Sequence, residues 1–127
     1  MPSWRERDCE KQACSRRDNE ATARARATAC GHALGSRLFR CECGAPKCAC
    51  AIDLTLADYE AVRAHATRFV IAPDHENPES ERIVEENERF AVVEQVTADE
   101  VKHARKSDPR RWRAPSTRIG RAQAGGR

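Results

Sequence analysis

Four cysteines lie close together in one stretch of the chain and have the chemistry to bind a metal ion. They occupy positions 41, 43, 48 and 50, as C-x-C, four intervening residues and a second C-x-C. Thiolates are soft ligands, which zinc binds in a tetrahedron. Gly44 and Pro46 lie between the two pairs, and both residue types favour a tight reversal of the chain. The stretch is therefore interpreted as a zinc knuckle, which Cys41 and Cys43 enter from one side of a turn and Cys48 from the other.

An iron–sulfur cluster, or disulfide and thiol redox chemistry, would use the same cysteines. No apolar segment of the signal-peptide type follows the N-terminus, so a cytoplasmic protein is expected. In a reducing cytosol structural disulfides are rare, and clustered cysteines more often bind metal. We therefore expect zinc as the cofactor.

Three thiolates and one further ligand would complete a structural zinc site. Cys50 is the nearest candidate in the sequence, but it needs a second tight turn to bind together with Cys48. His75 is the other candidate, because it lies in a proline-containing loop after a predicted strand over 69–71. Histidine is a common zinc partner of cysteine. The residues themselves leave both candidates open.

The composition limits the size of the hydrophobic core. The chain has 127 residues, of which 5% are aromatic and 34% are charged, so one small domain is expected. Small cores commonly need a metal or a disulfide to be stable. No apolar run is long enough to span a bilayer, which again indicates a soluble protein without a membrane partner.

The pattern of residues predicts an α+β fold with a small antiparallel sheet, a zinc knuckle, an N-terminal helix and one central helix. The N-terminal helix is expected over 16–33 and the central helix from Thr55, which resembles the first residue of a capping box. Strands are expected at 69–71, 83–85 and 90–96, followed by a short helix after Thr97. The predicted domain limits are a flexible N-terminus at 1–15, the folded domain at 16–106 and a basic disordered tail at 107–127.

The charges are distributed unevenly along the chain. Residues 102–127 contain nine Lys or Arg and one acid, whereas the rest contains 14 Lys or Arg and 19 acids. A basic tail can bind nucleic acid by neutralising phosphates while an aromatic ring stacks on a base. The candidate residues for that role are Arg110, Arg111, Trp112 and Arg113. The acidic stretch between Asp74 and Glu100 would instead suit a basic protein partner.

Several motifs resemble a family of small uncharacterised proteins from high-GC actinobacteria. They follow in order as F-x-C-E-C-G-x-P-x-C, I-D-L-T-x-x-x-Y-E-A-V-R-A, R-F-V-x-A-P-x-H-E-x-P and E-R-I-V-E-x-N-x-R-F-A-V-V-E. The resemblance covers residues 16–95 and implies a fold but no activity. It implies that Cys41, Cys43, Cys48 and His75 are the metal ligands. Family members usually have glycine where this chain has Asp74, and Cys50 is not a family position.

The combined features predict a non-enzymatic zinc-binding domain that serves as a protein-interaction or regulatory module. A closed four-ligand site leaves no position for an activated water. The chain has neither the H-x-E nor the P-C-x-x-C motif of zinc deaminases, and no phosphate-binding glycine loop. The alternatives are nucleic-acid binding through the basic tail and a thiol redox switch in which oxidation of Cys48 and Cys50 releases zinc.

Overall fold

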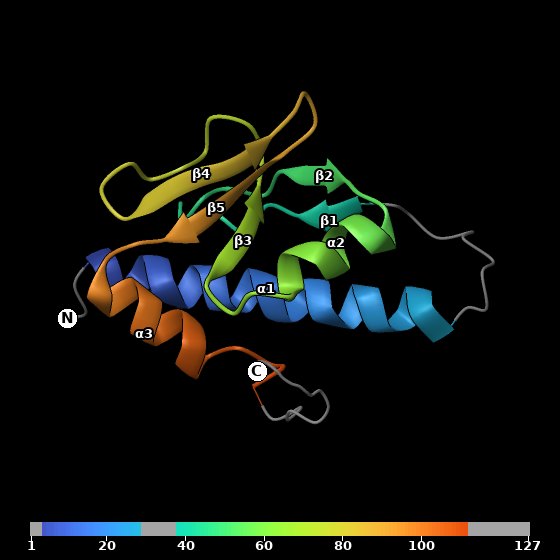
Figure 1. Cartoon of the computed structure of the whole chain (residues 1–127), viewed down its shortest axis with the longest axis horizontal. Helices are drawn as coiled ribbons and strands as arrows, with labels where there is room; N and C mark the ends of the chain where they lie inside the picture. The colour runs from blue at the N-terminus through green and yellow to red at the C-terminus, as the bar shows by residue number, and fades with distance from the viewer. Residues whose placement is uncertain (1–3, 29–37, 112–127) are drawn as a thin grey trace, which may run out of the picture.

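The computed structural model of the chain describes residues 4–28 and 38–111, and the protein has an α+β fold (Figure 1). A long N-terminal helix lies along one side of two small antiparallel sheets. The order of elements is α1 (Trp4–Thr28), β1 (Leu38–Arg40), β2 (Ala51–Asp53), α2 (Leu56–Arg63), β3 (Arg68–Ile71), β4 (Glu81–Glu86), β5 (Ala91–Gln95) and α3 (Ala98–Lys106). The predicted fold class is therefore confirmed.

Helix α1 begins twelve residues earlier than the sequence predicted, because its N-terminal half is packed against the domain. The expected flexible segment 1–15 was wrong from Trp4 onwards: Cys9, Gln12, Ala13 and Ser15 are buried. The buried residues of α1 recur at helical spacing, but most of them are polar. The polar ones are Gln12, Ser15, Arg16, Asn19 and Glu20. Gln12, Arg16, Asn19 and Glu20 form hydrogen bonds to other elements, and these bonds replace apolar contacts of the kind that usually hold a helix in place.

The strands form two separate sheets. Strands β1 and β2 pair as a hairpin, with Phe39 opposite Ile52. The second sheet has the order β3-β5-β4, and both of its pairs are antiparallel. The two sheets meet at Glu42 and Val70, where the Glu42 N–H donates to the Val70 carbonyl at 2.8 Å. The knuckle therefore adjoins the β3 edge of the larger sheet.

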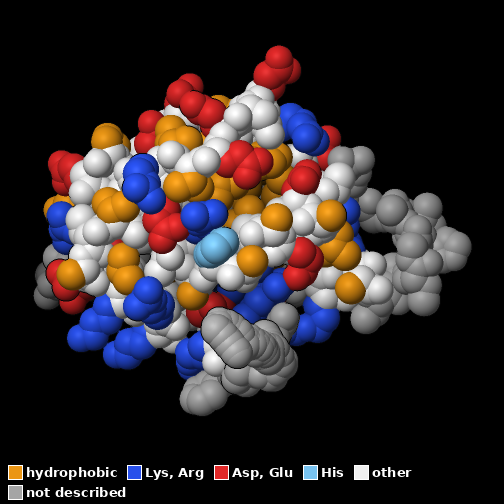
Figure 2. All heavy atoms as spheres, viewed as in Figure 1, with side chains coloured by type: hydrophobic (Ala, Val, Ile, Leu, Met, Phe, Trp, Pro, Cys, Tyr) orange, Lys and Arg blue, Asp and Glu red, His pale blue; other side chains and the backbone are white. Residues whose placement is uncertain are grey.

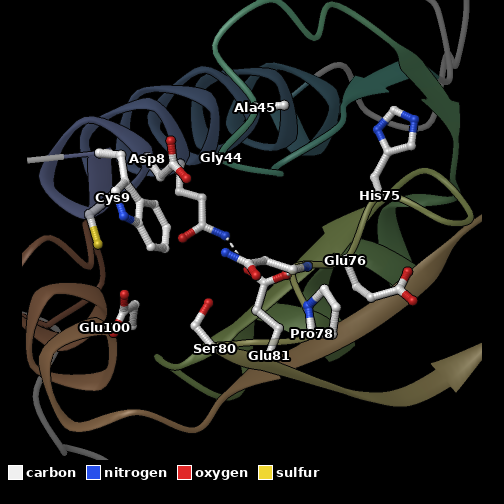
Figure 3. Close-up of a pocket in the computed structure, with 13 residues that line it drawn as sticks. Asp8, Cys9, Gly44, Ala45, His75, Glu76, Pro78, Ser80, Glu81 and Glu100 are labelled. Carbon is white, nitrogen blue, oxygen red and sulfur yellow. Dashed lines mark hydrogen bonds between the residues drawn. The ribbon is translucent and has the colours of Figure 1, made fainter.

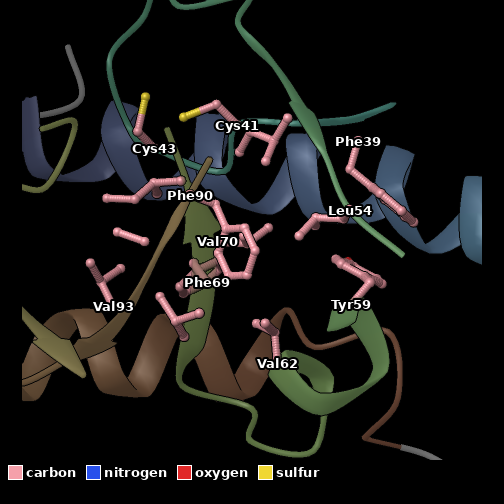
Figure 4. Close-up of a cluster of buried hydrophobic side chains, with 14 of the residues drawn as sticks. Phe39, Cys41, Cys43, Leu54, Tyr59, Val62, Phe69, Val70, Phe90 and Val93 are labelled. Carbon is pink, nitrogen blue, oxygen red and sulfur yellow. The ribbon is translucent and has the colours of Figure 1, made fainter. Parts of the chain in front are cut away.

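The hydrophobic core lies between the two sheets and α2 (Figure 4). Phe39 and Tyr59 stack with ring centroids 4.6 Å apart, and the β3 residues Val70 and Ile71 are fully buried. Helix α2 presents this face because it begins as predicted: Thr55 is its N-cap, and the side-chain oxygen accepts a hydrogen bond from the Asp58 N–H at 2.9 Å. Cys41 and Cys43 belong to the same core, so the knuckle is part of the folded interior.

The polypeptide that follows α3 remains packed on the domain, which corrects the predicted start of the tail at residue 107. Asp108 is buried and forms an ion pair with the guanidinium of Arg63, whose side chain is also buried. Arg110 pairs with Glu20 on α1 at 2.7 Å and with Glu60 on α2 at 2.7 Å. The predicted tail residues 112–127 lie outside the described residues. No helix in the described part of the chain is long and apolar enough to cross a membrane.

A candidate metal centre

The β1–β2 hairpin brings three cysteines to the same side of the knuckle. The ten residues between its strands contain Cys41, Cys43 and Cys48. The Cys41 N–H donates to the Cys50 carbonyl at 3.0 Å, and the Cys48 N–H donates to the Ala45 carbonyl at 3.2 Å. The first bond extends the hairpin by one residue pair, and the second closes the turn that returns Cys48 to the other two sulfurs.

The loop after β3 supplies the fourth side chain of the cluster. His75 follows Asp74, which is the one described non-glycine residue with a positive φ, at 70°. This left-handed conformation reverses the chain, and the His75 N–H donates to the Ala72 carbonyl at 3.1 Å. Asp74 thus adopts the conformation for which glycine is favoured. The loop directs the imidazole back to the knuckle.

The four side chains have the geometry of a tetrahedral metal site. His75 Nδ1 lies 3.5 Å from Cys41 Sγ, 3.7 Å from Cys43 Sγ and 3.5 Å from Cys48 Sγ. A zinc ion with ideal Zn–S and Zn–N bonds would place nitrogen and sulfur about 3.5 Å apart at a tetrahedral angle. All four ligand atoms lie within 4.8 Å of one another. The distances therefore match one ion at the centre of the cluster.

Cys50 does not belong to the cluster. It is exposed, and the group of described residues that could hold a metal ion consists of Cys41, Cys43, Cys48 and His75. The structure thus joins the three cysteines to His75, as the family resemblance implied, and leaves the competing thiol outside. A two-iron cluster would separate its terminal ligands with two metals and bridging sulfides, so the close packing of the four atoms favours a single ion.

The hydrogen bonds among the thiols determine which sulfur ionises first. The pKa of Cys43 is lowered to about 4, chiefly because the Cys41 thiol donates to its sulfur, and His75 adds a second hydrogen bond. The pKa of Cys41 is raised by the same interaction and by burial. The Ala72 N–H also donates to Cys41 Sγ at 3.1 Å, which favours negative charge on that sulfur. Thiolates are the metal-binding form of cysteine, so this environment suits a cation.

Glu42, between two of the cysteines, connects the knuckle to the rest of the fold. Its side chain is completely buried, and burial raises its pKa. One carboxylate oxygen accepts from Asn19 Nδ2 at 2.8 Å and from the Tyr59 hydroxyl at 2.9 Å, and the other accepts from the Val70 N–H at 3.0 Å. One side chain thereby links α1, α2 and β3. Sequence reasoning missed this role, because an acidic residue between two cysteines gives no sign of burial.

Helix α1 lies directly against the knuckle. A Cβ atom at Gly44 would stand 2.8 Å from Asp8 Cβ and 3.2 Å from the Asp8 carbonyl oxygen, so only glycine fits there. Lys11 Nζ donates to the Cys48 carbonyl at 3.2 Å. The Asn19 side chain donates to the Arg40 carbonyl at 2.9 Å and accepts from the Arg40 N–H at 2.7 Å. Gly44 is therefore required for close approach of the helix, in addition to any contribution to the turn.

The predicted nucleic-acid residues do not form a free basic surface in the described part of the chain. Arg110 lies between Glu20 and Glu60 and pairs with both, so a phosphate would have to compete with these two carboxylates. Arg111 Nη1 donates to the Asp108 carbonyl at 3.1 Å. Trp112 and Arg113 lie outside the described residues. The nucleic-acid role of Arg110 and of the rest of the basic tail stays a prediction.

The fold and the cluster together define a small α+β domain organised around a Cys3His group with metal-site geometry. Comparison of the chain with protein-family models, with curated proteins and with solved structures found no significant match. The resemblance to small actinobacterial proteins consequently stays a prediction from the motifs. What the protein does must be argued from its own geometry.

Proposed function

We propose that this protein is a non-enzymatic zinc-binding domain that serves as a protein-interaction module, with zinc as a structural ion. The observation that carries the proposal is the set of three sulfur-to-Nδ1 distances between 3.5 and 3.7 Å, which fits tetrahedral zinc. The donor set of three thiolates and one imidazole is typical of structural zinc and unusual for magnesium or calcium. Four protein ligands fill the tetrahedron, so the ion would be closed to substrate.

The role of such an ion would be to hold together parts of a domain that has a small core. The ligands join the β1–β2 hairpin to the loop after β3, and two of them, Cys41 and Cys43, are buried in the core. The free energy of metal binding at a structural site contributes to the stability of the fold, because the unfolded chain does not hold the ligands together. Removal of the ion should therefore loosen the hairpin and the His75 loop together.

Metal analysis of the purified chain tests the proposal. Native mass spectrometry should find one zinc ion per chain in the wild type and in Cys50→Ser, because Cys50 lies outside the cluster. His75→Ala should lose most of its zinc, whereas His75→Cys should retain zinc as a four-cysteine site. Full zinc occupancy in His75→Ala together with loss in Cys50→Ser would overturn the ligand assignment.

A chelation experiment tests the structural role of the ion. The zinc-loaded wild type should unfold in one cooperative thermal transition, and exhaustive chelation should lower its midpoint or abolish it. Re-addition of zinc should restore the transition in the wild type and not in a Cys43→Ser variant. An unchanged cooperative transition after complete metal removal would show that the ion is dispensable for the fold.

One observation favours a thiol redox switch as a second candidate function. Cys48 is the least buried of the three cysteine ligands, and the exposed thiol of Cys50 is only two residues away. Oxidation of Cys48 by hydrogen peroxide would form a sulfenic acid and water, and attack by the Cys50 thiol would release a second water and form a disulfide. Peptide mapping after mild peroxide treatment should then find a Cys48–Cys50 disulfide together with zinc release. Zinc retention after Cys14 has been oxidised would exclude this candidate.

A further inference from the structure

Helix α3 separates its charges onto two sides. Glu100 is buried and lines a cavity of about 290 Å³ between α1, α3 and the loop before β4, where it pairs with Arg5 at 2.6 Å (Figure 3). Lys102, Arg105 and Lys106 are exposed instead. The helix thus neutralises its buried acid internally and presents three cations to solvent. These three residues are called the α3 basic face.

The cations of the α3 basic face have no carboxylate partner among the described residues. The ion pairs of the described chain use other arginines, such as Arg5, Arg63 and Arg110. The helix dipole accounts for cations in the last turn, but Lys102 precedes that turn. Like charges three and four residues apart also repel one another. An anionic partner would relieve this repulsion.

The exposed acids of the domain gather on a different side. In Figure 2 acidic side chains are concentrated toward the β4 side at the top of the view, and Lys and Arg side chains along the lower left edge, where Figure 1 places α3. The acids on and around β4 include Glu79, Glu85, Glu86 and Glu88. A polyanion on α3 would therefore lie away from most of the negative charge that the sequence places in the folded domain.

The chemistry of the α3 basic face favours nucleic acid over an acidic protein or a membrane. The exposed large apolar residues of the described chain are Trp4, Leu38 and Val96, and none of them belongs to α3. Protein interfaces are usually centred on buried aromatic or apolar anchors, and helices that lie on membranes need an apolar face. Contact with phosphates requires cations alone.

The residues of α3 also distinguish among nucleic acids. Lys102 and Lys106 are about 6 Å apart along the helix axis, a span of roughly two base pairs of a duplex. The helix contains no aromatic residue on which an unpaired base could stack. It also contains no Ser, Thr, Asn or Gln to contact the 2′-hydroxyl groups by which RNA is recognised. These features favour the regular phosphate backbone of duplex DNA.

We propose that the α3 basic face binds the phosphate backbone of double-stranded DNA without preference for base sequence. This inference goes beyond the proposed zinc-binding and interaction function, and the two can fail separately. The positive charge continues along the chain after α3, because Arg111 is exposed and residues 112–127 contain four arginines and no acid. The surface on α3 is nevertheless assigned as a binding site in its own right.

Fluorescence anisotropy of a labelled mixed-sequence DNA duplex, titrated with the zinc-loaded full chain at several salt concentrations, tests the proposal. Lys102→Gln/Lys106→Gln should reduce the slope of log affinity against log salt by about two, and weaken binding at about 0.1 M salt at least tenfold. Lys102→Arg/Lys106→Arg keeps the charge and should keep the slope. Arg82→Gln/Arg89→Gln removes the same charge from exposed positions on and beyond β4 and should change the affinity by less than about twofold.

A second variant separates the helix from the chain that follows it. In a full-length protein with glutamine in place of Arg113, Arg118, Arg121 and Arg127, the α3 double substitution should still reduce the salt slope by about two. Loss of all binding from the four tail substitutions alone would overturn the assignment to α3. So would equal losses in the α3 and β4 double variants, or the absence of binding by the wild type.

Competing polyanions test the choice of partner. Duplex RNA of the same sequence should bind no more tightly than the DNA, and a polyglutamate peptide should displace the DNA poorly. Tighter binding of RNA, or displacement by polyglutamate as effective as by unlabelled DNA, would overturn the choice of DNA. Zinc content and melting temperature are measured on every variant, so that a loss of DNA binding with zinc retained refers to the surface charge and leaves the zinc assignment intact.

Discussion

At the scale of single residues, Asp74 determines whether the imidazole reaches the cysteines. Its φ of 70° is in the left-handed region, where a side chain costs about 1–2 kcal/mol. Aspartate and asparagine are tolerated there better than other residues with a side chain, because they are short and polar. The glycine that the resembling family has at this position would adopt the same conformation without that cost.

The effect of a substitution at position 74 on the free energy of unfolding should therefore depend on the backbone conformation that the new residue favours and not on its charge. Asp74→Gly should equal the wild type or gain up to about 1 kcal/mol, and Asp74→Val should lose about 1–3 kcal/mol, because a β-branched side chain is strongly disfavoured at positive φ. Urea unfolding of the zinc-loaded proteins measures both. Glu79→Val, an exposed position nearby with negative φ, is the matched control and should change stability little. Equal losses at the two positions would contradict the conformational explanation.

Glu42 is the second residue whose chemistry can be tested alone. Its three hydrogen bonds are all donated by neighbouring groups, so an acceptor oxygen is needed at both positions of the side-chain terminus. Glu42→Gln would direct an amide N–H₂ at one of those donors, and we expect a loss of about 1–3 kcal/mol. Urea unfolding at a fixed zinc concentration measures the loss, with Glu88→Gln as the exposed control. If Glu42→Gln were as stable as the wild type, the buried carboxylate would not connect the knuckle to the fold as described.

At the scale of secondary-structure elements, the contact between α1 and the knuckle depends on the absence of one side chain. Gly44→Ala would bring a Cβ to 2.8 Å from Asp8 Cβ, a distance that requires the helix or the hairpin to move. We expect a loss of about 1–3 kcal/mol, the range for overpacking, together with weaker zinc binding. Thermal unfolding and zinc competition with a chelator measure these effects.

A double variant separates steric overlap from any change in turn conformation. Asp8→Gly removes the closest atom and by itself costs roughly 1 kcal/mol, because glycine is unfavourable within a helix. When Asp8→Gly is combined with Gly44→Ala, the total loss should be smaller than the sum of the two single losses. Strict additivity would mean that Gly44 is needed for the turn alone.

The elements that the sequence predicted correctly are those with an ordinary apolar pattern. Short runs of β-branched and aromatic residues indicated strands β3, β4 and β5, and the Thr55 cap indicated α2. The extent of α1 was missed, because its buried face is made of residues such as Gln12, Arg16 and Asn19, which predict solvent exposure. Their burial depends on partners far away in the sequence, and a local pattern contains no information about those partners.

The candidate site was predictable to a similar degree. Spacing identified the cysteines as metal-type residues, and the geometry of the cluster agrees with Cys41, Cys43, Cys48 and His75. Spacing could not choose between Cys50 and His75, because that choice depends on how the loop after β3 folds back. It also gave no indication that Arg110 would be enclosed by Glu20 and Glu60.

At the scale of the whole molecule, a buried set of ion pairs joins α1, α2 and the C-terminal turn. Glu20 accepts from Arg63 at 2.6 Å and from Arg110 at 2.7 Å. Burial by itself would raise the pKa of Glu20, but the hydrogen bonds from the two arginines outweigh it and lower the pKa below 4.5. The ion pairs therefore stabilise the fold fully above the ordinary pKa of glutamate and lose their effect as the pH falls through the lower value of the folded state.

The pH dependence of stability should reveal this set of ion pairs. At neutral pH, Glu20→Gln should cost about 3 kcal/mol, because it leaves the buried Arg63 with one anionic partner fewer. The difference from the wild type should shrink as the pH falls below the ordinary pKa of glutamate, and it should vanish once the pH has passed through the lower pKa of Glu20 in the folded wild type. Chemical unfolding of both proteins across this pH range measures the difference between their free energies of unfolding. Any loss of a bound ion at low pH would affect both proteins equally and would cancel in that difference. A difference that stays constant with pH would contradict the assignment.

The polar buried face of α1 also has a consequence for how the chain is made. Arg5, Arg16 and Glu20 bind partners at Glu100, Ala104 and Arg110, roughly ninety residues later. During synthesis α1 can therefore contact the knuckle early, but it completes its contacts only after α3 and the turn that follows α3 have left the ribosome. A helix with an apolar face would expose a hydrophobic, aggregation-prone surface throughout that interval. The buried glutamine, arginine, asparagine and glutamate of α1 can be hydrated until those partners are synthesised, so the helix exposes little apolar surface in the meantime.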